Sequence, residues 1–407
     1  MIRTECCKRM KTPCDKQQNI LRAVVSYTFR TTAALCASGT LMQTFLKTVG
    51  FSSHQIYIHS TVIQAFTVIS ILLGATWADK GSVIRRSAFI CVPNALLFLC
   101  YLPICIGTSA GVEAYLLLLG VSALQAVTTG LNTVCEYKLP YYLYDSGDYG
   151  RVLGICGVIS ATVNFAVGAV VSWLVGFLAY REVMFAAFLL SFFFMLGASL
   201  MNGMQKPVCV SEDESSGKER RKDTTLAALR HPAFTLLIAP NFIRGLCAGI
   251  VGVLATVALD IGYDERTTTV LVSVQGIATF IGCSLFTALS KKVPYVRLIF
   301  LAGLCFLPLP LLLSMKTVVL LIVYFIVTVG RNVVDNAVPA MLRDVVPVGI
   351  AGPYHAMRMV LNNGGMMLAT LIAPLLPVPV LLTLTGILQV AAGGVYLWFM
   401  RRQRGQK

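Results

Sequence analysis

The chain is poor in charged residues: aspartate, glutamate, lysine and arginine make up 13% of its 407 residues. Soluble domains carry about 25%, so this composition and a mean hydropathy of +0.76 exclude an ordinary soluble domain. Histidine is also scarce, with four residues at spacings that fit no metal site. A phosphate-binding glycine-rich loop is absent as well. We therefore expect no metal, no cofactor, no enzymatic activity and no nucleotide-driven transport within this chain.

Long apolar runs are what the sequence has in abundance, and 57% of its residues are hydrophobic. A helix that crosses a bilayer needs roughly 20 consecutive apolar residues. The runs predict an all-α membrane protein with twelve transmembrane helices. They lie near residues 20–46, 55–78, 87–107, 113–135, 151–177, 183–201, 233–259, 268–289, 296–314, 317–341, 354–376 and 379–400.

The net charge of +15 is unevenly spread over the loops. Basic residues gather on one side of the predicted membrane, whereas the other side has only Lys47, Arg181, Arg266 and Lys316. The positive-inside rule therefore places both termini in the cytoplasm, with the chain in the plasma membrane. Because topology explains the basic residues, they do not indicate nucleic-acid binding. The first apolar run is too long for a cleavable signal peptide.

Residues 203–231 interrupt the apolar pattern with a charged segment and predict a cytoplasmic linker. The expected domains are a six-helix bundle at 1–202, this linker, and a second six-helix bundle at 232–407. The pattern from Gly130-x-Asn132-x-Val134 to Pro-x-x-Leu-x-Asp145 recurs between residues 330 and 344. We interpret it as the trace of a duplicated unit, which makes the two bundles pseudo-symmetric. In such folds the substrate site lies between the repeats.

The loop between the second and third runs reads Gly74-Ala75-Thr76-Trp77-Ala78-Asp79-Lys80-Gly81-Ser82-Val83-Ile84-Arg85-Arg86. It resembles the loop motif of the major facilitator superfamily, Gly-x-x-x-Asp-Arg-x-Gly-Arg-Arg, although Ala75 stands at the place of the first glycine, Gly81 comes one place early and the arginines are displaced. The twelve spans, the linker and the repeat extend the resemblance over essentially the whole chain. It implies transport of a small solute by alternating access. It also implies a cytoplasmic latch that Asp79, Lys80, Arg85 and Arg86 form with Glu136, Asp145 or Arg151.

Two arginines, Arg30 and Arg244, lie deep in apolar helices at equivalent places in the two halves. A charge at bilayer depth costs several kcal/mol, and neither arginine has an acid nearby in its own helix. They therefore suggest a site for an anion, since guanidinium grips carboxylate or phosphate bidentately. We expect them to face each other across the central cavity and bind one anionic group. The alternative is a structural arginine bonded to carbonyls or to a distant acid such as Asp335.

The placement of these arginines resembles the organophosphate–phosphate antiporters, which use one arginine on each of helices 1 and 7 to clamp phosphate. Tyr27 and Arg30 form a Tyr-x-x-Arg that looks like theirs. That group has a histidine on helix 5, where this chain has Asn164. The resemblance therefore implies the arginine pair and leaves the substrate open.

Other polar residues within the spans are candidates for the same site or for coupling. Gln275 and Asn362 are expected to line the cavity, although membrane helices also use such residues to hold neighbours together. Arg331 and Asp335 are four residues apart and can pair along one helix face. We expect this pair to serve in gating or coupling, with Asp335 as a candidate carrier of a proton.

The sequence thus predicts a monomeric secondary transporter in the lipid bilayer, with a small organic anion as the favoured cargo. Coupling to a proton or to a counter-anion is open. A proton-coupled exporter of drugs or amphipathic compounds is one alternative, although the expected Gly-Pro element of helix 5 is missing. A sugar permease is the other, and it would favour glutamine, asparagine and aromatic contacts over arginines.

Overall fold

The computed structural model describes residues 13–37, 39–77, 82–107, 111–143, 146–206, 232–290, 292–345 and 351–405. These residues form helices and short connections, with no β-strand among them. The N-terminal half contains α2 (Pro13–Ala37), α3 (Gly39–Val49), α4 (Ser53–Trp77), α5 (Val83–Leu99), α6 (Leu102–Ile106), α7 (Val112–Leu143), α8 (Ser146–Leu174) and α9 (Tyr180–Gly203). The C-terminal half contains α11 (Pro232–Gly252), α12 (Leu254–Ile261), α13 (Glu265–Ser290), α14 (Tyr295–Leu304), η1 (Leu309–Ser314), α15 (Thr317–Val345), α16 (Ala351–Ile372), η3 (Ala373–Leu375) and α17 (Val378–Gly405).

The helices follow the predicted spans closely. Among the described residues, nine helical segments are long and apolar enough to cross a membrane, and α11 with α12 makes a tenth that bends by 48°. The two remaining predicted spans correspond to α2 with α3 and to α16. Both of these segments contain polar or charged residues within their apolar runs, such as Arg30 and Asn362.

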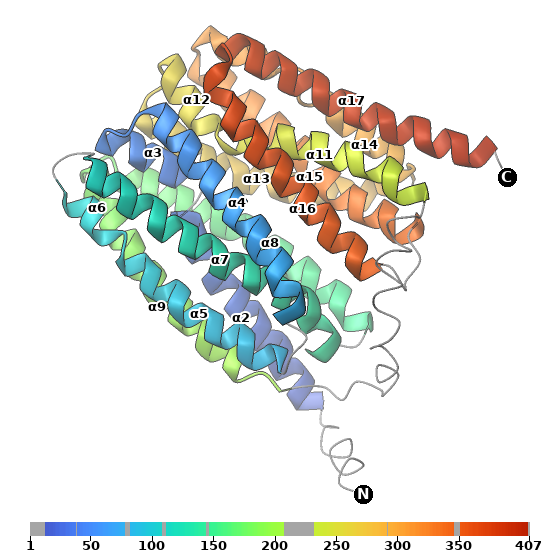
Figure 1. The fold of residues 1–407 in the computed structure, drawn as a ribbon, viewed down its shortest axis with the longest axis horizontal. Coiled ribbons are helices and arrows are strands. Elements are labelled where there is room, and N and C mark those ends of the chain that lie inside the picture. Colours follow the sequence, from blue (N-terminus) through green and yellow to red (C-terminus); the bar gives the residue numbers. More distant parts are fainter. Residues whose placement is uncertain are drawn as a thin grey trace, which may run out of the picture.

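Helices of each half pack mainly against one another, and the two halves lie side by side (Figure 1). Two helix pairs join the halves along most of their length, α8 with α13 and α4 with α16. The α8–α13 crossing is close because glycines allow it: a Cβ atom on Gly168 would lie 2.5 Å from the backbone nitrogen of Ser273. The predicted linker falls mostly on residues 207–231, which lie outside the described part of the chain.

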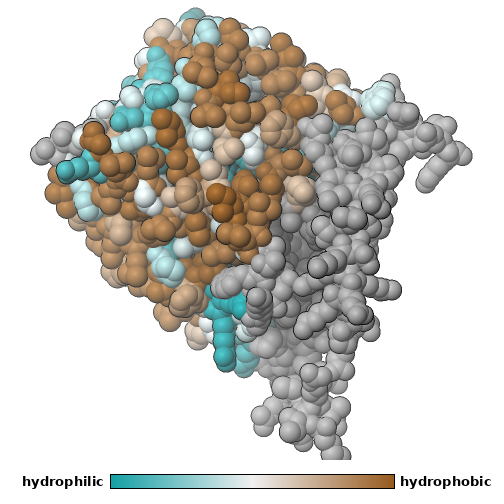
Figure 2. Space-filling model, viewed as in Figure 1, coloured by the Kyte–Doolittle hydropathy of each residue, from teal (hydrophilic) through white to brown (hydrophobic). Residues whose placement is uncertain are grey.

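The coloured part of the face in Figure 2 is mostly apolar, with hydrophilic residues toward its edges. Large apolar side chains such as Phe89 and Trp173 are 70% and 63% exposed. Their exposure suits a hydrocarbon environment, in which apolar side chains face lipid and helices satisfy their own backbone groups.

The two ends of the molecule differ in the elements that form them. The far end, opposite the start of α2 and the end of α17, includes the C-terminus of α3, all of α6 and the C-terminus of α12 (Figure 1). Arg181, at the start of α9, donates to the carbonyls of Gly107 and Val49 at 2.5 and 3.4 Å. It thereby satisfies carbonyls at two helix ends that would otherwise lack partners.

Candidate functional site

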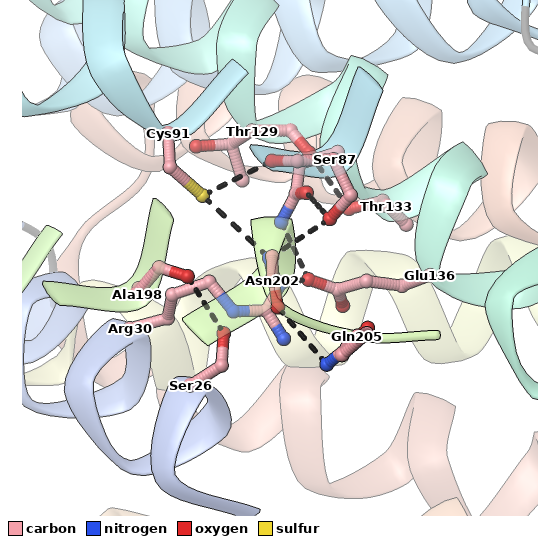
Figure 3. A network of polar contacts seen from close by, with 11 residues as sticks. Ser26, Arg30, Ser87, Cys91, Thr129, Thr133, Glu136, Ala198, Asn202 and Gln205 are labelled. Carbon is pink, nitrogen blue, oxygen red and sulfur yellow. Dashed lines mark hydrogen bonds and ion pairs between the residues drawn. The ribbon is translucent and has the colours of Figure 1, made fainter. Parts of the chain in front are cut away.

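The N-half cluster is a set of polar side chains in the N-terminal half: Arg30, Ser87, Asn132, Glu136 and Asn202. Figure 3 shows Arg30, Ser87, Glu136 and Asn202 of this cluster. Arg30 of α2 forms an ion pair with Glu136 of α7. The amide of Asn132, one helical turn before Glu136, donates to the Glu136 carboxylate at 2.5 Å. The carboxylate of Glu136 is thus held from two directions.

The N-half cluster continues away from the ion pair through two further helices. Ser87 of α5 donates to the Oδ1 atom of Asn132 at 3.2 Å, and Asn202 of α9 donates to Ser87 at 3.0 Å. Ser87 and Asn202 are 1% and 4% exposed. Because buried polar groups are costly when unpaired, such a network fixes the orientation of its members. The cluster therefore ties α2, α5, α7 and α9 together around one balanced charge pair.

The C-half cluster consists of Arg244, Arg331, Asp335 and Asn241. Arg244 of α11 and Asp335 of α15 form an ion pair with an Nη2–Oδ1 distance of 2.7 Å. Arg331 approaches the other oxygen of the same carboxylate at 3.6 Å. Arg244 also donates to Asn241 at 3.3 Å. Two guanidinium groups therefore share one carboxylate.

The side chains of the C-half cluster differ in their exposure. The side chain of Arg244 is 9% exposed, whereas those of Arg331 and Asp335 are 38% and 51% exposed. The cluster borders a cavity of about 60 Å³ within the second bundle. Its lining residues come from α11, α15, α16, α17 and the turn after α14. They are Arg244, Ala248, Phe306, Arg331, Val334, Asp335, Asn362 and Gln389.

The expectation of two arginines without neutralising acids is wrong. Arg30 pairs with Glu136 and Arg244 pairs with Asp335, and each acid lies on a different helix from its arginine. Each guanidinium is engaged by an acid of its own half. The joint binding of one anionic group by the two arginines stays a prediction. The alternative with Asp335 as the distant partner is the arrangement present for Arg244. The predicted pairing of Arg331 with Asp335 is confirmed.

The other predicted binding residues are dispersed. Asn362 joins Arg244 at the C-half cavity. Gln275 accepts a hydrogen bond from the Tyr324 hydroxyl at 3.2 Å. Asn164 is 6% exposed, and its Oδ1 atom has no hydrogen-bond partner among the described residues. Tyr27 is half-buried on α2, one turn before Arg30.

The predicted latch is only partly within the described residues. Asp79, Lys80 and Asp145 lie outside them, so the latch stays a prediction. Arg86, in the first turn of α5, lies near Cys135 of α7. Glu136 belongs to the N-half cluster through its pairing with Arg30.

Several residues of the two clusters were not predicted from the sequence. The repeat could have indicated one of them, Asn132. Asn132 is the asparagine of the duplicated Gly-x-Asn-x-Val pattern, and its counterpart Asn332 donates to Thr279 at 3.2 Å. Both asparagines therefore donate a side-chain hydrogen bond to another side chain of their own half. Gln389 and Phe306 carried no comparable signal, because nothing in their local sequence distinguishes them from other residues of apolar helices.

Apolar helices long enough to cross a bilayer, with ion pairs between them, define a polytopic membrane protein. The model of the Major Facilitator Superfamily matches residues 23–374, and the chain belongs to this family. Members of the family are transporters rather than enzymes. A search of curated proteins found no match.

Solved structures of transporters share this fold at low sequence identity. A mutant form of the nucleoside transporter NupG has a TM-score of 0.70 and 11% identity, covering 93% of this chain and 99% of its own. A bacterial homologue of the human lysosomal transporter Spinster has a TM-score of 0.68 and 12% identity, covering 96% and 98%. A D-xylose–proton symporter has a TM-score of 0.70 and 11% identity, covering 93% and 96%. The named solutes of these transporters differ, so the shared fold does not identify the cargo of this chain.

Proposed function

We propose that the protein is a secondary active transporter that moves a small organic anion by alternating access, and that the anion binds at the C-half cluster. The observation that carries the proposal is the charge balance of this cluster. Two guanidinium groups, Arg244 and Arg331, meet one carboxylate, Asp335, so two positive charges minus one negative leave a formal charge of +1. The excess charge borders a cavity, where a ligand can neutralise it.

The chemistry of the cavity lining suits a small anion. Arginine carries five N–H donors in a planar fork that matches carboxylate and phosphate oxygens. The 3.6 Å contact of Arg331 with Asp335 is long, and its side chain is 38% exposed, so it has donors to offer a ligand. Asn362 and Gln389 add neutral polar groups, and Phe306 adds an apolar wall. The volume of about 60 Å³ favours a cargo of few atoms or a cavity that widens on binding.

The N-half cluster contributes differently to this proposal. Its single arginine and single acid balance, so it offers no excess charge to an anion. We assign the Arg30–Glu136 pair to holding α2 against α7. Asn164 is the strongest remaining candidate for a polar contact from the first half, because a buried amide oxygen without a partner can accept a hydrogen bond from a ligand.

Ligand binding to the purified protein tests the anion assignment. A thermal-shift screen should find anionic metabolites that raise the melting temperature, because a ligand that binds only the folded state stabilises it. Arg331→Gln should weaken the affinity for such a ligand by about ten- to hundredfold, the effect of losing a charge-assisted hydrogen bond of about 1.5–3 kcal/mol. Arg297→Gln removes an exposed arginine from the same half and serves as the control. A neutral ligand that binds equally well to wild type, Arg331→Gln and Arg244→Lys would refute the proposal.

Transport in reconstituted vesicles distinguishes the modes of coupling. A proton on Asp335 or a counter-anion in the cavity would each change the charge of the C-half cluster. Either can therefore be the coupled species. Exchange that needs anion inside the vesicles and ignores a pH gradient indicates antiport. Uptake that follows a pH gradient and is uncoupled by Asp335→Asn indicates a proton. Proton-driven efflux of neutral or cationic amphipathic compounds would instead support the exporter alternative.

We further propose that the protein lies in the plasma membrane as a monomer with both termini in the cytoplasm. The distribution of basic residues among the loops supports the orientation. This orientation makes the far end of the molecule the extracellular end.

A further inference from the structure

One described membrane-spanning segment is broken between α11 and α12, whose axes differ by 48°. Kinks of more than about 20° have identifiable causes: proline, glycine or serine pairs, a π-bulge, or a side chain or water inserted between backbone partners. The proline of this segment, Pro240, lies three turns before the break. The chain at the break is Gly252-Val253-Leu254, without proline.

A side chain from the other half of the molecule is inserted at this break. Gln43 of α3 donates through Nε2 to the carbonyl oxygen of Gly252 at 2.5 Å. Its Oε1 atom accepts from the backbone nitrogen of Thr256 at 3.4 Å and from the Thr256 hydroxyl at 3.3 Å. In a continuous α-helix, the N–H of Thr256 would donate to the carbonyl of Gly252. The carboxamide of Gln43 therefore stands in the place of one helical hydrogen bond and serves both of its partners.

The contact extends one helical turn toward the far end. Lys47, four residues after Gln43, pairs with Asp260, four residues after Thr256, at 2.7 Å. Ser53 also donates to Asp260, at 2.5 Å. Residues four apart share a helix face, so α3 and α12 meet along matching faces. The side chain of Gln43 is 5% exposed within this contact.

We propose that Gln43 is a wedge that couples closure of the far end to bending of the α11–α12 segment. While the halves meet at the far end, the carboxamide holds Gly252 and Thr256 apart and the helix is bent. When the halves separate there, Gln43 leaves, and the two backbone groups bond to each other because buried backbone groups are rarely left unpaired. Opening of the far end and straightening of the helix then occur together. This goes beyond the proposed function and holds for any cargo.

The chemistry explains why glutamine is suited to the position. The wedge needs one donor for Gly252 and one acceptor for Thr256 at the tip of a side chain of this length, and a primary amide supplies both. Gln43→Met keeps the approximate shape and supplies neither. Gln43→Glu keeps the acceptor and loses the donor to Gly252. Gln55→Met makes the same substitution at a glutamine whose side chain bonds locally to Ser52, and so provides a matched control.

Distances between spin labels on the purified full-length protein report whether the far end is open. Exposed residues His54 and Arg266 carry one label in each half, in a background without other accessible cysteines. Gln43→Met should lower the ratio of short to long distances by at least about tenfold, since three hydrogen bonds of about 1 kcal/mol each are lost. Gln43→Glu should lie between this variant and wild type, and Gln55→Met should match wild type. Equal ratios in Gln43→Met and Gln55→Met would overturn the proposal.

A second measurement separates a wedge from a mere adhesive contact. The hydroxyls of Thr44 and Thr268 are 3.2 Å apart across the two halves, so cysteines at these two positions are the pair to cross-link. Oxidised Thr44→Cys/Thr268→Cys protein has its far end closed with or without the wedge. Its cryo-electron microscopy structure should retain the bend with Gln43 and lose most of it in the Gln43→Met background. A bend that persists at about 48° without Gln43 would overturn the proposal. If Gln43→Met does not fold, Gln43→Glu replaces it in both measurements.

Discussion

The Arg30–Glu136 pair yields a prediction in which the sign of the result is decisive. If Arg30 had no acid partner at this depth, its charge would destabilise the fold, and Arg30→Gln would raise the melting temperature. Arg30 pairs with Glu136 in the structure, and removing one member of a buried pair leaves the other uncompensated. We therefore expect Arg30→Gln and Glu136→Gln each to lower the melting temperature of the purified protein.

The magnitude follows from the exposure of the pair. Breaking a buried ion pair costs about 3–5 kcal/mol, whereas an exposed pair contributes about 0–1 kcal/mol. The side chain of Arg30 is 15% exposed and that of Glu136 is 40% exposed, which places the pair between these limits. We expect each single substitution to cost about 2 kcal/mol. The double variant Arg30→Gln/Glu136→Gln should cost less than the sum of the two, because neither charge is then left alone.

The assay is a double-mutant cycle on four proteins in the same detergent. Wild type should be the most stable, the double variant should come next, and both single variants should melt below it. Arg297→Gln, an exposed substitution of the same type, should leave the melting temperature unchanged. Additive losses, with the double variant the least stable, would show that the two side chains do not interact. A higher melting temperature for Arg30→Gln alone would refute the pairing directly.

Two further predictions concern helix packing and topology. Gly168→Ala should destabilise the protein by about 1–3 kcal/mol, because its Cβ atom would lie 2.5 Å from a backbone atom of α13; Gly157→Ala on the same helix meets nothing within 4 Å and should be neutral or slightly stabilising in the same melting experiment. A cysteine at His54 should react with an impermeant thiol reagent on intact cells, whereas one at Ser216 should react only after lysis, because the basic loops are predicted to be cytoplasmic. Comparable melting of the two alanine variants, or labelling of position 216 alone on intact cells, would contradict the respective prediction.

Much of the fold could be predicted from the sequence, because the signal for a membrane helix is local. Apolar runs of sufficient length located the helices to within a few residues for most spans. The bend at Val253 was missed, since the apolar run from 233 to 259 continues across residues 252–254, where there is no proline. The side chain placed at this break, Gln43, comes from a helix about 210 residues earlier in the chain. A contact between residues so far apart in the sequence cannot be predicted from a local pattern.

The candidate site shows the same division between local and tertiary information. The depth of Arg30 and Arg244 and the pairing of Arg331 with Asp335 follow from position along a helix and from a spacing of four residues. The acids that neutralise the two arginines lie on other helices, so helical spacing cannot find them. The repeat offered a route, because Glu136 and Asp335 follow the glycines of the duplicated pattern by six and five residues. Aligning the halves around those glycines would have placed both acids in equivalent segments.

The unequal balance of the two charged clusters has an electrical consequence. On the proposed function, the C-half cluster bears a charge of +1 when empty and becomes neutral when it holds a monovalent anion. Moving one elementary charge through a potential of 100 mV is worth about 2.3 kcal/mol. The membrane voltage would then act on the return of the empty carrier and leave the loaded step nearly untouched. A carrier of this kind would generate current in the half-cycle during which it transports nothing.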